Sequence, residues 1–198
     1  MAAAAANGKL YVFGGRDSGL VSDKTYEYDP GQNHWQEKRP LPGGGSSYLA
    51  AAANNGKIYV LSSGSAINSL AIYDPATDIW TNATALSATS ADQAVGLTAA
   101  PDGFLYAISN GSGASSANAA QRYDPHTDRW AVISSLPTQA NFDATVYAAG
   151  RVFTLGGRTA QTNVALTVAN SFCQSTKTTQ QTTVTPGGRI TYTLTLNP

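Results

Sequence analysis

The sequence predicts an all-β protein built from four copies of a unit of just under fifty residues. Two motifs recur in phase along its 198 residues. In one, a glycine precedes a short aromatic and aliphatic run, and these glycines are Gly8, Gly56, Gly103 and Gly150. In the other, Tyr-Asp-Pro is followed by Trp at positions 35, 80 and 130. Because both motifs keep one period, each copy is expected to be a supersecondary unit that stacks on its neighbours.

The first half of each copy predicts a β-hairpin. Small apolar stretches, such as residues 48–53 and 94–100, suit a first strand that lies close to neighbouring backbone. A tight turn follows, which is a strong hairpin signal; its residues are Asn7-Gly8, Asn55-Gly56 and Asp102-Gly103. In the first copy, the second strand is expected to stop at Gly14 and Gly15, where glycine permits a positive φ and the close approach of another segment.

The second half of each copy predicts two more strands around the Tyr-Asp-Pro turn. The third strand is expected to end at Tyr and the fourth to begin at Trp. Aspartate can close an Asx-turn, while the proline presets φ. We interpret the paired rings as core between adjoining sheets rather than as ligand-stacking surfaces. The residues are Tyr28, Asp29 and Trp35, then Tyr73, Asp74 and Trp80, then Tyr123, Asp124 and Trp130.

This combination of motifs resembles the kelch repeat over about residues 1–170. The resemblance implies four-stranded blades of a β-propeller. Its glycine pair is present as Gly14-Gly15 and Gly156-Gly157. The second copy has Ser62-Ser63 and the third Ser109-Asn110 instead, each followed by glycine, so the turn there is expected to shift by one residue.

Both ends of the repeat array are expected to be incomplete. Met1 aligns with Leu49, inside a first strand, and the fourth copy lacks Tyr-Asp-Pro and Trp after its third-strand candidate, residues 163–170. The kelch resemblance implies six or seven blades, the last often completed by a strand from the other end of the chain. We therefore interpret the sequence as the C-terminal part of a longer propeller, whose missing strand lies upstream of Met1. A complete four-bladed ring is the alternative.

The composition changes after residue 170. Residues 171–180 are expected to form a polar linker. Residues 181–198 contain a Pro-Gly-Gly turn and an alternating strand, with Ile190, Tyr192, Leu194 and Leu196 on one face. This segment resembles the start of an immunoglobulin-like repeat of bacterial cell-surface proteins. The resemblance implies a sandwich that is cut after its second strand.

Composition also argues against several partners. The formal net charge is +0 and only 12% of residues are charged, so no basic field favours nucleic acid or an anionic membrane. No apolar run approaches the ~20 residues of a membrane-spanning helix. Surface polarity must come from Ser, Thr, Asn and Gln, which is typical of secreted and cell-surface proteins. We therefore expect an extracellular or cell-surface location, although residues 1–6 do not form a signal peptide.

No catalytic, metal or cofactor site is expected. A copper oxidase of the galactose oxidase type would need a Tyr–Cys crosslink and two His ligands. Here His34 and His126 occupy variable positions of the Tyr-Asp-Pro turn, and Cys173 lies beyond the repeats. A kelch-type sialic-acid epimerase would need polar residues converging on a central channel, which we do not identify. Asp78 and Asp128 are interpreted as further members of the same turns.

The face with the longer connections is the candidate binding surface. Antiparallel order places the 2–3 and 4–1 connections on one face, and long loops on a rigid scaffold often carry function. The first such loop is expected at residues 16–22. The candidate binding residues are Arg16, Asp17, Lys38, Arg39, Asn110 and Arg158.

These observations favour a non-catalytic scaffold, part of a secreted or cell-surface bacterial protein, that binds a protein or carbohydrate ligand on this face. Two alternatives stay open. The chain could belong to a carbohydrate-active kelch enzyme whose catalytic residues lie outside it. It could also belong to an intracellular kelch adaptor.

Overall fold

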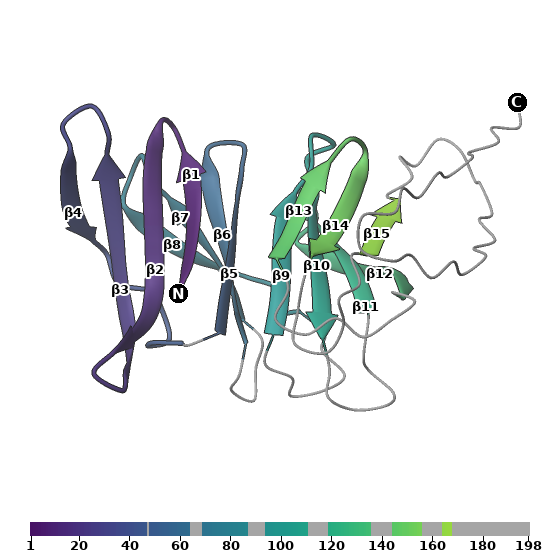
Figure 1. Cartoon of the computed structure of the whole chain (residues 1–198), viewed down its shortest axis with the longest axis horizontal. Helices are drawn as coiled ribbons and strands as arrows, with labels where there is room; N and C mark the ends of the chain where they lie inside the picture. Colours follow the sequence, from purple (N-terminus) through teal and green to yellow (C-terminus); the bar gives the residue numbers. More distant parts are fainter. Residues whose placement is uncertain are drawn as a thin grey trace, which may run out of the picture. The chain divides into compact units, whose positions relative to one another are not determined.

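The computed structural model describes residues 1–46, 48–63, 69–86, 94–110, 119–135, 144–155 and 164–167 (Figure 1). Every regular element in these ranges is a β-strand, and they include no helix that could cross a membrane. The chain divides into two compact units, Met1–Thr167 and Val168–Pro198. The second unit lies outside the described residues. The linker and the immunoglobulin-like start therefore stay predictions.

The described strands form four antiparallel sheets in chain order, which we call blades 1 to 4. Blade 1 contains β1 (Ala2–Ala6), β2 (Lys9–Asp17), β3 (Leu20–Asp29) and β4 (His34–Lys38). Blade 2 contains β5 (Tyr48–Asn54), β6 (Lys57–Ser63), β7 (Ser69–Asp74) and β8 (Ile79–Ala83). Blade 3 contains β9 (Ala94–Ala99), β10 (Leu105–Asn110), β11 (Ala119–Asp124) and β12 (Arg129–Ser135). Blade 4 contains β13 (Ala144–Ala148), β14 (Arg151–Leu155) and β15 (Val164–Thr167).

This all-β arrangement is the partial propeller that the sequence predicts. Blade 1 has four strands, but β1 has 5 residues where β5 has 7. Blade 4 is described with three strands, the third within the predicted stretch 163–170. Within the described residues, blades 1 and 4 do not close a four-bladed ring, because apolar side chains on their outward faces are exposed, among them Leu10 and Val146.

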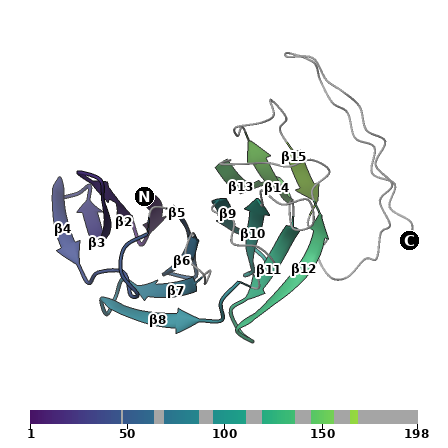
Figure 2. The ribbon, with the colours of Figure 1, turned by 90° about the horizontal axis from the view of Figure 1, so that it is seen from below.

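The first strands of successive blades lie side by side: β1 contacts β5, β5 contacts β9, and β9 contacts β13 (Figure 2). Their small residues allow this approach. Gly96 of β9 is the tightest case, since a Cβ built there would overlap the side chain of Thr145 on β13. The alanine-rich stretches of the sequence are therefore explained by backbone proximity between blades.

The hairpin turns agree with the sequence in two blades and differ in the third. Asn7-Gly8 and Asn55-Gly56 both have positive φ, as a two-residue hairpin turn requires. Blade 3 instead uses a longer turn, in which Ala100 N–H donates to Phe104 O at 3.0 Å and Gly103 N–H donates to Ala100 O at 3.0 Å. Pro101 explains the change, because it stands at the repeat position of Asn54, which pairs with Lys57 in blade 2, and proline has no N–H to donate in that pair.

The prediction that the second strand of blade 1 stops at Gly14-Gly15 is wrong. Strand β2 continues to Asp17 and pairs with β3 as far as Leu20, so residues 16–22 are largely strand rather than loop. The glycines form a bulge with φ values of 58° and 112°, and the ladder changes register there. Gly14 does permit close approach, since a Cβ would lie 2.5 Å from Leu49 Cδ1. A bulge and a strand end both favour glycine, and here the ladder resumes.

Each blade has two apolar faces. We call the face toward the next blade in the chain its forward face and the opposite one its rear face. Tyr11 and Phe13 on the forward face of blade 1 pack with Ile58, Val60 and Tyr73 on the rear face of blade 2. A second cluster joins blades 2 and 3 through side chains that include Tyr59, Leu61, Leu97, Leu105 and Tyr123. Alternation along each strand thus supplies both interfaces.

Replacing Gly96 with alanine should destabilise the protein by about 1–3 kcal/mol, because the added methyl group overlaps Thr145. Urea unfolding checks this. The double variant Gly96→Ala/Thr145→Gly removes the overlap, so its loss should be smaller than the sum of the two single losses. Additive losses would contradict this packing.

Candidate functional site

The Tyr-Asp-Pro turn of one blade binds, through hydrogen bonds, the connector segment that follows the last strand of the previous blade. Trp80 Nε1 donates a hydrogen bond to Arg39 O at 3.0 Å, while Arg39 N–H donates to Asp78 Oδ1 at 3.1 Å. The next pair of blades repeats this. Trp130 Nε1 donates to Thr84 O at 2.9 Å, and Thr84 N–H donates to Asp128 Oδ1 at 2.8 Å. We call this arrangement the connector clamp.

The clamp aspartates are fixed from within their own blade. Tyr73 and Tyr123 donate their hydroxyls to Asp78 and Asp128, each at 2.7 Å. Both aspartates have positive φ, 54° and 53°, a conformation that Asp and Asn tolerate well. The Thr84 N–H and the Tyr123 hydroxyl lower the pKa of Asp128 below its ordinary value. Burial, and then the hydrogen bond to aspartate, raises the pKa of each tyrosine.

Sequence reasoning missed this role for Asp78 and Asp128 by treating them only as turn residues. The available signal is an Asp or Asn five residues after the motif tyrosine. In blade 1 this residue is Asn33, whose Oδ1 accepts the Tyr28 hydroxyl at 2.8 Å. The other turn predictions hold: Asp29, Asp74 and Asp124 accept main-chain N–H groups two residues ahead.

The structure places the three motif tryptophans in two environments. Trp80 and Trp130 are partly buried at the edges of the two inter-blade clusters. Trp35 is 48% exposed, so it does not fill space between sheets as the sequence suggested. The reason is geometric: within the described residues, no blade lies against the rear face of blade 1.

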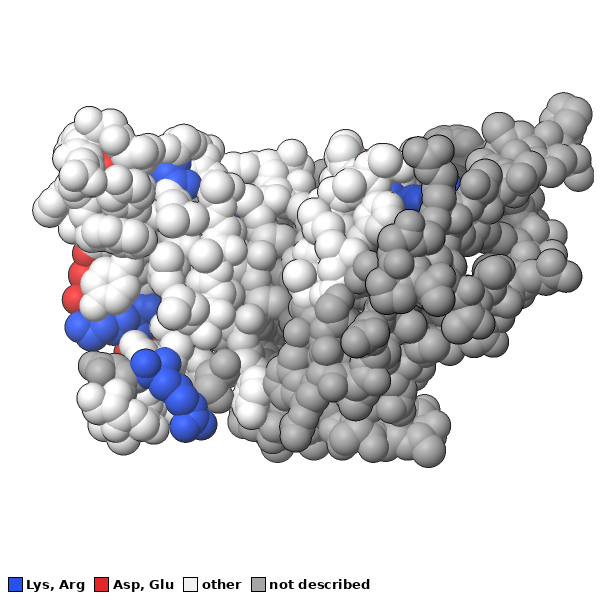
Figure 3. Space-filling model, viewed as in Figure 1, with Lys and Arg blue, Asp and Glu red and all other residues white. Residues whose placement is uncertain are grey.

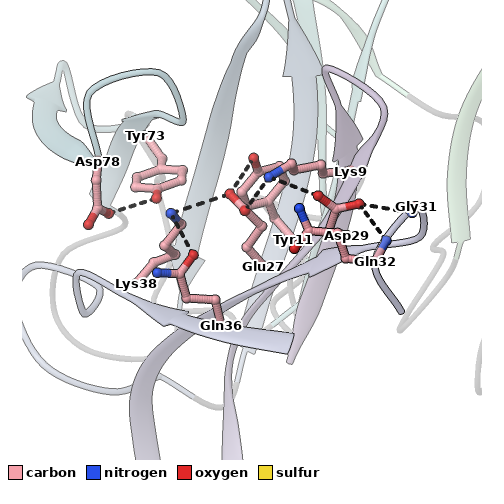
Figure 4. Close-up of polar contacts among 10 residues, drawn as sticks. All are labelled: Lys9, Tyr11, Glu27, Asp29, Gly31, Gln32, Gln36, Lys38, Tyr73 and Asp78. Carbon is pink, nitrogen blue, oxygen red and sulfur yellow. Dashed lines mark hydrogen bonds and ion pairs between the residues drawn. The ribbon is translucent and has the colours of Figure 1, made fainter. Parts of the chain in front are cut away.

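A polar cluster lies on the forward face of blade 1, around the buried Glu27 (Figure 4). Its carboxylate pairs with Lys9 at 2.7 Å and Lys38 at 3.5 Å, and accepts the Tyr11 hydroxyl at 2.8 Å. Burial alone would raise the pKa of Glu27, but the hydrogen bonds from Lys9 and Tyr11 and the two positive charges hold it below the ordinary value. These groups satisfy one another, so the cluster is structural.

The structure places the candidate binding residues in different environments. Arg16 is exposed on β2, and Arg39 has an exposed side chain although its main chain is clamped. Lys38 is partly buried and paired with Glu27, which removes it from the candidate surface. Asp17 and Asn110 lie at the ends of β2 and β10, where only the backbone is described. Arg158, with Gly156 and Gly157, lies outside the described residues.

Arg16 lies near the tip of the β2–β3 hairpin at the 2–3/4–1 edge of blade 1, whereas Arg39 follows β4 and has its main chain bound by the 3–4 turn of blade 2. The register pairs Arg16 with Val21 and Lys38 with Thr25, so β4 ends four residues of β3 short of the level of Arg16. The β2–β3 hairpin extends beyond the bulge to a tip at Ser18-Gly19 (Figure 1). On the face of the molecule that Figure 3 shows, charged side chains are few, and most of them lie over blade 1. The 2–3/4–1 edge of blade 1 is therefore the candidate site.

The hairpin tip adds two residues that sequence reasoning missed. Leu20 is 76% and Val21 44% exposed. The connector after β4 packs along the base of this hairpin: Leu41 N–H donates to Asp23 O at 2.7 Å, and Gly45 lies so close that a Cβ there would be 2.7 Å from Ser22 O. An exposed apolar pair thus lies at the end of a braced hairpin.

Comparisons with known proteins agree with this architecture. The family model for the kelch motif matches residues 1–42. Human Kelch-like protein 35 is 31% identical over 152 residues, which is 75% of this chain and 25% of that protein. The chain carries a kelch repeat domain. Human Kelch-like protein 33 is 32% identical over 136 residues, 65% of this chain and 25% of that protein. The kelch domain described here thus spans about a quarter of the length of these relatives.

A solved structure, that of YjhT, supports the fold of the kelch domain. It superposes with a TM-score of 0.63 over 79% of this chain and 57% of its own, at 16% sequence identity. At this identity the likeness concerns the fold alone.

The connector clamp predicts unequal effects of matched substitutions. Asp78→Ala removes the acceptor of both Tyr73 and Arg39, so it should cost about 1–3 kcal/mol of unfolding free energy. Asn33→Ala alters the equivalent position, also at positive φ, but removes only the bond within blade 1 and should cost less. Urea unfolding of both variants measures the difference. Equal losses would show that the inter-blade bond contributes nothing.

The Glu27 cluster predicts acid sensitivity. Its lowered pKa means that ionised Glu27 stabilises the fold above the ordinary value of 4.5, and that this contribution is lost as the pH falls through the lowered pKa. Glu27→Gln should cost about 1–3 kcal/mol at neutral pH and progressively less in acid. Urea unfolding between about pH 7 and about pH 3 measures this trend. Glu37→Gln, in an exposed pair with Lys24, is the control and should change little. A Glu27→Gln loss that does not shrink in acid would refute the assignment.

Proposed function

We propose that this kelch domain is a non-catalytic scaffold that binds a protein partner at the 2–3/4–1 edge of blade 1. The observation that carries the proposal is the extended β2–β3 hairpin, which presents Leu20 and Val21 to solvent next to Arg16. The resemblance to kelch-like proteins supports a binding rather than a chemical role.

The chemistry of the hairpin tip suits a protein surface. Exposed apolar side chains favour association because contact removes them from water, and arginine is enriched where interfaces concentrate binding energy. Leu20 is three-quarters exposed, so most of its side chain is available to a partner.

The hairpin is also pre-ordered, which lowers the entropic cost of binding. Cross-strand pairs run up to Asp17 and Leu20, and the turn between them takes positive φ at Ser18 and Gly19, 49° and 88°. The connector braces the base of the hairpin through the bond from Leu41 to Asp23. A partner therefore meets a formed surface rather than a loop that must order.

Panning a random peptide-display library against the purified chain tests the proposal, followed by affinity measurements with the selected peptides. Binding should weaken at least about tenfold in the Leu20→Ser/Val21→Ser variant, while the melting temperature stays unchanged. Ile79→Ser is the matched control, because Ile79 is 46% exposed at the start of β8, on the opposite edge of its blade, and should not affect affinity. Peptides that bind the tip variant with undiminished affinity, or a library that yields none, would refute the proposal.

A further inference from the structure

The rear face of blade 1 repeats a surface that is buried in blade 2. Leu10, Val12, Tyr28 and Trp35 occupy the repeat positions of Ile58, Val60, Tyr73 and Trp80. In blade 2, Ile58, Val60 and Tyr73 are at most 1% exposed, because blade 1 covers them. In blade 1, Leu10 is 37% and Trp35 48% exposed. Equivalent apolar side chains are therefore buried on the rear face of blade 2 and exposed to solvent on the rear face of blade 1.

The clamp on this face is already in its binding geometry. The Tyr28 and Trp35 rings lie 4.9 Å apart at 36°, and the occupied clamp of blade 2 has Tyr73 and Trp80 at 4.9 Å and 39°. Asn33 takes the place of Asp78, is held by the Tyr28 hydroxyl and has a similar φ of 48°. The structure thus holds a formed half-clamp for the main chain of another blade's connector.

The forward face of blade 4 is the complementary open surface. Val146, Phe153 and Leu155 occupy the repeat positions of Ala4, Tyr11 and Phe13, which pack on blade 2. Val146 is 43% and Leu155 40% exposed, whereas Tyr11 and Phe13 are at most 1% exposed. The described residues therefore contain both halves of one more inter-blade interface, one half on each terminal blade.

We propose that two copies of this chain associate head to tail, with the rear face of blade 1 in one copy against the forward face of blade 4 in the other. The contact reproduces the packing that joins the blades within each copy. It is heterologous, since two different surfaces meet, so it either closes into a ring or extends into an open assembly. This proposal is independent of the hairpin tip and of its partner.

Complementation between two variants tests the head-to-tail contact. Leu10→Asp places a charge on the rear face of blade 1, and Leu155→Asp does so on the forward face of blade 4. Both side chains are more than one-third exposed, so folding should tolerate the changes, and circular dichroism checks this. Sedimentation velocity over about a hundredfold range of concentration should show that wild type associates and that each variant alone is monomeric.

An equimolar mixture of the two variants should form a one-to-one dimer, because each supplies the surface that the other has lost. Ile79→Asp, at a residue exposed elsewhere on the molecule, should associate like wild type. A monomeric wild type would overturn the proposal. This result is expected if the rear face of blade 1 is covered by another part of a longer polypeptide and not by a second copy. A mixture that stays monomeric, or association that neither variant weakens, would also overturn it.

Discussion

The connector clamp is the interaction on which the described architecture depends. A blade is one twisted sheet with two apolar faces, and its fold does not specify how the next blade sits on it. The clamp supplies that information, because an aspartate and a tryptophan of one blade bind the N–H and C=O of one residue that leaves the previous blade. Hydrogen bonds are directional, whereas apolar contact is not, so the clamp sets register and the buried rings supply most of the favourable free energy.

This division separates the parts that build the scaffold from the parts available for binding. The clamp binds main-chain groups of Arg39 and Thr84, so any residue other than proline, which lacks the N–H, can occupy those positions without loss of the clamp. Side chains at the 2–3/4–1 edge are free to differ between blades, as the Leu20 and Val21 tip of blade 1 illustrates. A braced edge of variable chemistry is well suited to recognition, while the repeated turn on the opposite edge keeps the blades in place.

Much of the fold could be predicted from the sequence, because each motif records contacts within one blade. Tyr-Asp-Pro and Trp predicted the cross-strand pairs Tyr73–Trp80 and Tyr123–Trp130. The clamp could not be predicted in this way, since its acceptors bind main chain 39 and 44 residues away and main chain leaves no sequence pattern. The extended hairpin was missed because glycine marks a bulge as readily as a strand end. Lys38 was predicted to be a surface residue because its ion pair with Glu27 could not be foreseen. Glu27 lies on the neighbouring strand, two residues from the position that pairs with Lys38.

Hydrogen exchange of the three indole Nε1–H groups tests the central claim most directly. Measured by NMR at a concentration where the chain is monomeric, Trp80 and Trp130 should exchange slowly, because each donates to the connector of the previous blade. Trp35 should exchange much faster, because its indole is exposed and its half-clamp is open. Similar rates for all three indoles would show that the clamp does not hold the blades together.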